Sequence, residues 1–334
     1  MTCTPPFYVV AVHGGAGVHS PDSEAQVKRA MKIACRKSLL LLQDRRSSVD
    51  AVQEADDSES TTGFGSNLTL TGTVECDASI MCGATGAFGG VGAVSGIRHP
   101  VKLARSILEY SRRSDPLGRI APLFVPTTLR AVQTTEHRVP NRMLVADGAL
   151  QFARPQGIAT VPPDNLVAPR AREEWERWKA VLDSASSAGS TGGYPATLGP
   201  PERQDGASSP AGTGDTSLHH VQDTVGAVAC DGVGSFAAGV SSGGLLLKHP
   251  GRIGEAAMYG AGCWSATPSH GDVGGAACSV SGAGEHIIRA ALARSIVEAL
   301  ELPDIDTHET IQRMLLDGLR GESIYVSFSS VHYG

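Results

Sequence analysis

Asp223 and Thr224 stand where a stretch rich in serine and glycine gives way to an apolar run, "TVGAVAC". A threonine hydroxyl is a poor nucleophile without a base, and the free α-amine of an N-terminal threonine supplies that base within one residue. Such an amine has a pKa of about 7.7–8.0, so it accepts a proton near neutral pH. This chemistry requires a cut between Asp223 and Thr224, made by attack of the hydroxyl on the preceding carbonyl. The ordinary alternative is a threonine that simply begins a strand, because β-branched residues favour strands.

The segment before this site has the composition of a flexible loop. Residues 184–222 are dominated by serine, glycine, proline, threonine and alanine, with too few large apolar side chains to offset the entropy of ordering. Such a segment commonly links two independent domains. The halves on either side both combine strands with helices, and neither looks complete alone. We therefore expect one layered domain over residues 1–334 that exposes this loop.

The rest of the chain alternates predicted strands and helices. An apolar run over residues 7–17 predicts a strand that enters a glycine turn, and helical spacing follows over 23–43. After the loop, residues 224–244 predict two strands joined by an Asp-Gly turn. A small-residue strand ends at Gly282 and is followed by an amphipathic helix, and a last strand is predicted over 324–329.

Composition excludes several classes of function. The 334 residues are 41% hydrophobic and 19% charged, with a net charge of −6 and no basic block, so nucleic-acid and membrane-surface binding lack electrostatic support. We expect no signal peptide and no transmembrane span. Seven scattered cysteines without a C-x-x-C pair favour reduced thiols and argue against a zinc site. These features predict a protein of the cytoplasm and/or nucleus that is not secreted.

Five ordered blocks of sequence carry a family resemblance: "HGGAG", "GSNLTLTGTVECDASIM", "VGAVSGIRHP", "DTVGAVACDGVGSFAAGVSSGG" and "SGAGEHIIR". Together they resemble the type-2 asparaginase family of N-terminal nucleophile (Ntn) hydrolases. Within it, "ECDASIM", "SSGGLLLKHPGRIG" and "GAGCW" look most like the threonine aspartases. The resemblance implies an α+β fold, a four-layer αββα sandwich. It also implies autocleavage into an α chain (1–223) and a β chain (224–334), which pair as a heterodimer or a dimer of heterodimers.

The resemblance also assigns roles to individual residues. Thr224 is the nucleophile, its α-amine is the base, and Ser242 supplies a hydroxyl that hydrogen-bonds it. Arg252 reads the substrate carboxylate, for which a guanidinium fork is well suited. Further contacts to the substrate or to an oxyanion fall to Gly282, Ser281 and Asn67. No catalytic cofactor and no catalytic metal is expected, although a structural sodium ion is possible at "GFGSNL".

Three functions from different classes remain open. The first, favoured by Asp223 before the nucleophile, is a threonine endopeptidase that cuts protein substrates after aspartate. The second is an L-asparaginase or isoaspartyl dipeptidase. Those enzymes place an aspartate after "GRIG" to hold the free α-amino group of the substrate, and this chain has Glu255 there.

The third is an inactive, truncated variant of the protease, suggested by departures from the family pattern. The helix before "GFGSNL" is shortened and carries Thr61 and Thr62, and Cys82 replaces an aspartate. An extra segment is predicted over 125–140. Strands expected after the last predicted one are missing, which would leave backbone groups unpaired.

Overall fold

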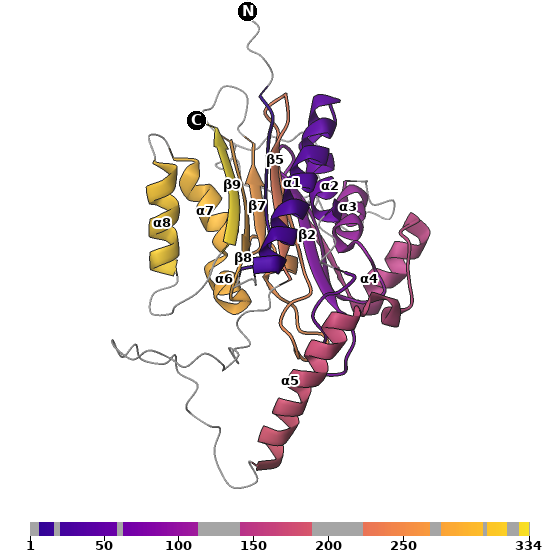
Figure 1. Ribbon diagram of the computed structural model, residues 1–334. Helices are drawn as coiled ribbons and strands as arrows, with labels where there is room; N and C mark the ends of the chain where they lie inside the picture. Colours follow the sequence, from indigo (N-terminus) through magenta and orange to yellow (C-terminus); the bar gives the residue numbers. More distant parts are fainter. Residues whose placement is uncertain are drawn as a thin grey trace, which may run out of the picture.

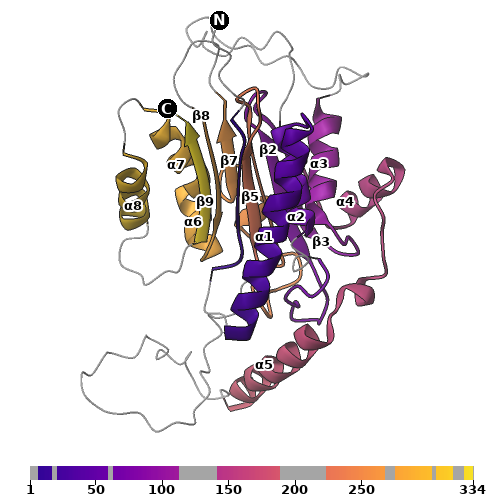
Figure 2. The same cartoon turned by 45° about the horizontal axis from the view of Figure 1, so that its top comes forward.

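The structure is a computed structural model that describes residues 7–16, 21–58, 63–112, 141–188, 223–267, 275–302, 306–318 and 327–333. Two sheets lie face to face between two layers of helices, as Figures 1 and 2 show. The predicted α+β fold with an αββα sandwich is therefore confirmed. The described ranges leave out most of the predicted loop, together with Thr61, Thr62 and the segment 125–140.

The first sheet has six strands in the order β1-β5-β6-β2-β3-β4. These strands are β1 Val9–His13, β5 Val225–Cys230, β6 Phe236–Ser242, β2 Cys76–Cys82, β3 Ala87–Val94 and β4 Asn141–Val145. All neighbours pair antiparallel except β3 and β4, which are parallel. The two strands that follow Thr224 thus lie between strands from the first part of the chain. Every residue of β5 and β6 is buried, which explains their apolar and small side chains.

The second sheet is antiparallel in the order β7-β8-β9, formed by Cys263–Ala266, Gly275–Ser281 and Ser327–Tyr333. The strand predicted over 324–329 overlaps β9, and its first three residues lie outside the described ranges. The two sheets approach closely: a Cβ placed on Gly226 of β5 would lie 2.1 Å from the Oγ of Ser279 on β8. Glycine at this position is therefore required by the close approach of the two sheets.

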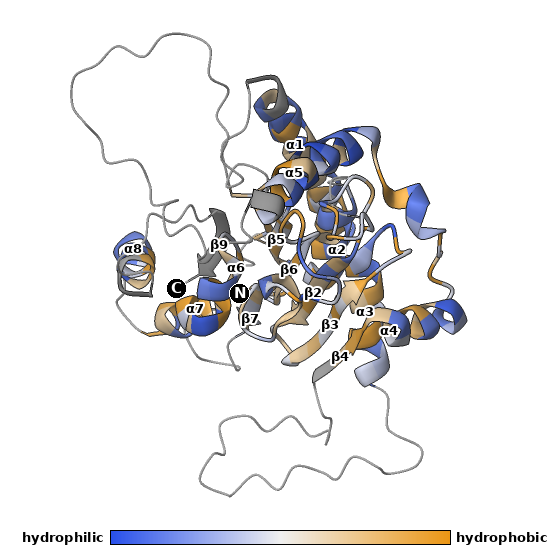
Figure 3. Cartoon of the chain, turned by 90° about the horizontal axis from the view of Figure 1, so that it is seen from below, coloured by the Kyte–Doolittle hydropathy of each residue, from blue (hydrophilic) through white to orange (hydrophobic). Residues whose placement is uncertain are grey.

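Helices cover the outer face of each sheet (Figure 3). The first sheet is covered by α1 Pro21–Gln43, α2 Ser48–Ser58, α3 Pro100–Ser111 and α4 Ala146–Ala153. On the second sheet, α6 Gly284–Ala290 leads into α7 Leu292–Leu300, which packs on β7 and β8, and α8 Thr307–Gly318 packs on α7. The helix α5 Pro169–Ala188 extends away from the layers (Figure 1). Short 3₁₀ helices span Arg154–Gln156, Pro163–Leu166 and Glu255–Ala257. No helix in the described part of the chain is long and apolar enough to span a membrane.

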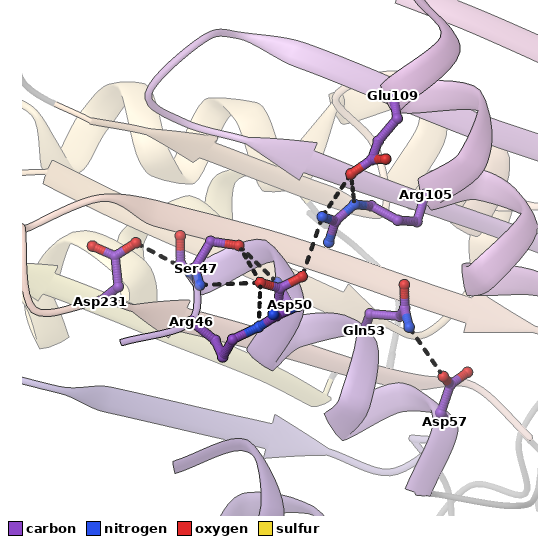
Figure 4. Close-up of polar contacts among 9 residues, drawn as sticks. Arg46, Ser47, Asp50, Gln53, Asp57, Arg105, Glu109 and Asp231 are labelled. Atoms are coloured by element: carbon purple, nitrogen blue, oxygen red, sulfur yellow. Dashed lines mark hydrogen bonds and ion pairs between the residues drawn. The ribbon is translucent and has the colours of Figure 1, made fainter. Parts of the chain in front are cut away.

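Helix α2, which the sequence predicts to be shortened, contacts both strands that follow Thr224. It packs against β5 and β6, and its first residue, Ser48, donates its backbone N–H to Asp231 in the turn between these strands at 3.1 Å. On the same helix, Asp50 pairs with Arg105 of α3 at 3.2 Å (Figure 4). These contacts tie α2 to the β5–β6 turn and to α3.

Candidate active site

The β5–β6 hairpin brings the two predicted hydroxyls together. Its register pairs Val225 with Ser241, so Thr224 faces Ser242 across the end of the hairpin. The Oγ1 of Thr224 lies 2.9 Å from the Oγ of Ser242, and both residues are 3% exposed. The Oγ of Ser242 also accepts the backbone N–H of Gly244 at 3.0 Å. The nucleophile predicted from sequence therefore sits in a buried, oriented hydrogen bond.

Asp223 precedes Thr224, and its carboxylate accepts two backbone hydrogen bonds. It accepts the N–H of Asn67 at 2.9 Å and the N–H of Gly243 at 3.0 Å. We call these two N–H groups the amide cradle. Burial raises the pKa of the Asp223 carboxyl, and the two backbone hydrogen bonds and the positive charge of Lys248 oppose that rise.

A small cavity opens beside Thr224. It is lined by Thr224, Ser242, Gly244, Leu245, Arg252, Glu255, Gly282 and Gly284. About 10 Å³ is available to the centre of a water molecule, which is room for roughly one water. A substrate needs more space than this, so binding requires the chain around the cavity to move or the bond before Thr224 to be cut.

Arg252 lines this cavity within a group of carboxylates. We call Arg252, Asp77, Glu255 and Glu285 the Arg252 cluster. The Nη2 atom of Arg252 donates to Oε1 of Glu285 at 2.5 Å. Glu255 is 5% exposed, and burial raises the pKa of its carboxyl to about 7. Partial burial by itself would raise the pKa of Glu285, but the hydrogen bond from Arg252, a backbone hydrogen bond and the nearby positive charges together lower it.

Asp77 on β2 fixes the backbone of this cluster. Its Oδ1 accepts the N–H of Ala93 and its Oδ2 accepts the N–H of Gly254, both at 2.8 Å. Gly254 lies between Arg252 and Glu255 in sequence, so one buried carboxylate sets the path of the chain that carries both. Burial raises the pKa of Asp77, whereas Lys248 and the two N–H donors lower it.

Of the other predicted site residues, one lines the cavity and two do not. Gly282 lines the cavity, but the side chains of Ser281 and Asn67 are not among its lining groups. The Oγ of Ser281 accepts the N–H of Ala16 at 3.2 Å, and the Asn67 amide donates to the carbonyl of Gly244 at 2.8 Å. An oxyanion contact from Asn67 and a substrate contact from Ser281 therefore remain predictions.

Sequence reasoning missed three residues of the site: Asp77, Gly284 and Glu285. All three lie inside quoted blocks, "ECDASIM" and "SGAGEHIIR". Gly284 has a steric reason, since a Cβ there would lie 2.5 Å from Oε2 of Glu255. An acidic residue beside a glycine at the start of a helix was the available signal, but nothing in the sequence alone connected it to Arg252.

The described residues contain no group of three or more His, Cys, Asp or Glu side chains placed to hold a metal ion. A structural sodium ion at "GFGSNL" stays a prediction.

Comparison with known proteins agrees with the resemblance noted in the sequence. The sequence model of the family described as Asparaginase (Asparaginase_2) matches residues 6–117 and 125–321. This match includes residues 125–140 and leaves out 118–124, and the extra segment predicted over 125–140 stays a prediction.

Curated relatives are similar over most of the chain. An isoaspartyl peptidase/L-asparaginase from Homo sapiens is 32% identical over 292 residues, covering 86% of this chain and 74% of the relative. One of the same name from Danio rerio is 32% identical over 299 residues, covering 88% and 76%. An isoaspartyl peptidase from Salmonella typhimurium is 29% identical over 321 residues, covering 93% and 84%. With the αββα fold and the buried threonine in place, the chain belongs to the type-2 asparaginase family of Ntn hydrolases.

Proposed function

We propose that this chain is a self-activating threonine hydrolase that acts on an aspartyl group of its substrate. The observation that carries the proposal is the Thr224–Ser242 contact of 2.9 Å in a cavity that Arg252 and Glu255 also line. An aspartyl group has two carboxyl carbons. Thr224 attacks one of them, and Arg252 binds the other as a carboxylate through a charge-assisted hydrogen bond.

Self-cleavage comes first in this scheme. The Oγ1 of Thr224 attacks the carbonyl carbon of Asp223, the bond from that carbon to the Thr224 nitrogen breaks, and an ester forms. Water then hydrolyses the ester and leaves Asp223 with a new carboxylate and Thr224 with a free amine. The amide cradle holds the Asp223 side chain in place during the attack. The products are the segments 1–223 and 224–334.

The two segments stay together because their strands interleave. In the first sheet, β5 and β6 of the second segment lie between β1 and β2 of the first. Strand β1 pairs with β5 along its length, and β2 pairs with β6 from Asp77 to Cys82. Separation would expose the buried faces of four strands, so we propose that the active form is at least an αβ heterodimer.

The first candidate substrate class is isoaspartyl peptides and L-asparagine, and the names of the relatives favour it. In such substrates the carbonyl under attack is the β one, and both an α-carboxylate and an α-ammonium are free. Arg252 suits the carboxylate. Glu255 lines the same cavity and, when ionised, suits the ammonium.

The second candidate is an internal aspartyl bond of a protein, cut on the carboxyl side of the aspartate. Two observations favour it: the self-cleavage site itself is Asp223–Thr224, and "SSGGLLLKHPGRIG" resembles the threonine aspartases. Here the α-carbonyl is attacked and Arg252 binds the β-carboxylate. No free ammonium is present, so Glu255 has no partner on the substrate.

One experiment tests the proposal and separates the candidates. Purified protein is incubated, its self-cleavage is followed by intact mass, and it is then given β-aspartyl-leucine, L-asparagine and a peptide with the sequence of residues 219–228. Release of leucine or ammonia supports the first candidate, and a cut after the aspartate of the peptide supports the second. Thr224→Ala is expected to stay uncut and inactive.

The matched control is Thr310→Ala, which changes another threonine that is 3% exposed, on α8. It should cut itself and turn over substrate as the parent does. If the parent stays a single uncut chain, self-activation is refuted. If it cuts itself but hydrolyses none of the three substrates, aspartyl specificity is refuted while the nucleophile stands. Glu255→Gln sharpens the choice, since only the first candidate needs that charge.

A further inference from the structure

Three glycines leave the space that the guanidinium of Arg252 fills in the cavity wall. A Cβ placed on Gly244 or on Gly254 would lie 3.2 or 3.1 Å from its Nη1 atom, and one on Gly284 would lie 3.2 Å from its Nη2 atom. The guanidinium therefore fills space that any side chain at these positions would crowd. Gly244 and Gly284 also line the cavity, so both terminal nitrogens of Arg252 lie beside the wall that a substrate carboxylate would face.

The carboxylates around this fork are held in different ways. Asp77 is fully buried and accepts two backbone N–H groups, so it is fixed. Glu255 is buried at the start of a 3₁₀ helix. The side chain of Glu285 is 64% exposed, and it approaches Arg252, whose own side chain is 19% exposed, from the solvent side. Of these three carboxylates, Glu285 is the one that can swing into water at little cost.

The Arg252 nitrogen that Glu285 contacts is also the one that lies beside Gly284 in the cavity wall. The Oε1 of Glu285 accepts from Nη2 of Arg252, and Nη2 is the nitrogen beside Gly284. Nη1 lies beside Gly244 of the same wall, so a substrate carboxylate that engages the whole fork from the cavity meets both nitrogens. Both carboxylates carry a negative charge, so they compete for the donor and also repel one another.

We infer that Glu285 is a specificity-determining residue of the proposed hydrolase, an internal carboxylate that occupies Arg252 in the empty site and that a substrate carboxylate must displace. The inference rests on the proposed function for the identity of the displacing group. A carboxylate ligand gains both nitrogens of the Arg252 fork only after it releases Glu285. Ligands without a carboxylate gain nothing from that exchange and are rejected.

The test measures binding without turnover. L-aspartate is titrated calorimetrically into the purified protein, whose state of cleavage is established by intact mass, and the parent is compared with Glu285→Gln. The matched control is Glu298→Gln, which removes an exposed glutamate that pairs with Arg294 at 2.6 Å on α7, away from the cavity. We expect Glu285→Gln to bind L-aspartate about two- to fivefold more tightly, because an exposed ion pair contributes a free energy of that size. Glu298→Gln should bind L-aspartate as the parent does. The gain should shrink toward zero as salt is raised, because an exposed pair is screened.

Weaker binding by Glu285→Gln would overturn the inference, since Glu285 would then be positioning Arg252 rather than competing for it. Equal binding by all three proteins, or absence of binding to all three, would overturn it as well. Failure of the proposed function gives a different result, in which L-aspartate binds with the expected order of affinities but none of the three aspartyl substrates is hydrolysed.

Discussion

Two regions on either side of Thr224 hold carboxylates by different means. The amide cradle holds Asp223 with two backbone N–H groups on a loop and a strand end, and the Ser66 hydroxyl and the positive charge of Lys248 also favour its ionised form. The Arg252 cluster offers a full positive charge, already shared with Glu285. Covalent attachment delivers the Asp223 side chain at high effective concentration, so backbone donors suffice there, whereas a diffusing substrate benefits from the full charge and the fork of Arg252. Under the proposed function, this difference indicates that self-cleavage and turnover recognise their carboxylates separately.

The largest effect should come from Arg252→Lys, which breaks the second region alone. A lysine ammonium lacks the fork and cannot fill the space between the three glycines, so kcat/KM should fall about 100-fold through loss of charge-assisted hydrogen bonding. Self-cleavage should proceed, because Asp223 is held by the amide cradle. Intact mass reports the cut, and steady-state kinetics on the best of the three substrates report turnover.

Arg294→Lys is the control for that substitution, since Arg294 pairs with a glutamate on the surface of α7. It should leave both steps unchanged. Loss of self-cleavage together with turnover in Arg252→Lys, in a protein that is still folded, would show that the two regions act as one.

Asp223→Asn breaks the first region. An asparagine amide accepts one of the cradle N–H groups with its oxygen but turns an NH₂ toward the other, so one hydrogen bond to a charged acceptor is lost. Self-cleavage should slow by about tenfold, in line with the cost of such a bond. Molecules that have cut themselves should show parental kcat/KM, because Arg252 is untouched. The rate is measured as the appearance of the 224–334 segment by mass.

Asp183→Asn on the exposed side of α5 serves as its control and should cut itself at the parental rate. Faster self-cleavage in Asp223→Asn would contradict a supporting role for the carboxylate. Unchanged self-cleavage would show that the amide cradle holds Asp223 without aiding the attack.

The Arg252 cluster holds three carboxylates and one arginine, so we expect the stability of the folded protein to depend on pH. Because burial raises the pKa of Glu255 from 4.5 to about 7, the folded chain binds more protons than the unfolded chain within that window. Stability therefore falls as pH rises from 4.5 through 7, by at most about 3 kcal/mol. In the uncut Thr224→Ala background, adding Glu255→Gln should flatten this part of the profile. Urea unfolding at pH 5 and pH 8 measures it, and an equal slope with and without Glu255 would refute the assignment.

The contrast between the regions also explains what sequence could predict. Thr224 and Ser242 are eighteen residues apart on one hairpin, so a turn at Asp231–Ser235 and strand register suffice to bring them together. Such contacts follow from local pattern. The family blocks likewise predicted the four layers and the place of Arg252 and Glu255.

The convergence on Arg252 could not be predicted in the same way. Asp77 comes from β2, Glu255 follows the Arg252 loop, and Glu285 begins α6, and only the packing of the two sheets brings these elements to one cavity. Asn67 shows the same dependence on packing. Its oxyanion contact stays a prediction, whereas its amide donates to the carbonyl of Gly244 and its backbone N–H donates to Asp223. Hydrogen-bond partners of a polar residue depend on which loops meet, and sequence spacing does not record that.

The smallest effect we expect is from Gly284→Ala, which sharpens the comparison without removing a charge. The new methyl would lie 2.5 Å from Oε2 of Glu255 and 3.2 Å from Nη2 of Arg252, both at the ends of flexible side chains that can shift. The free energy of unfolding should therefore fall by only about 1 kcal/mol, at the low end for overpacking. KM should rise several-fold as the fork is displaced. Self-cleavage should keep its parental rate, because nothing in the amide cradle moves. Gly148→Ala is the matched control, since a Cβ there meets nothing within 4 Å. If Gly284→Ala slows self-cleavage as much as it raises KM, the amide cradle and the Arg252 cluster are coupled through the cavity wall. The two carboxylate sites would then not act independently.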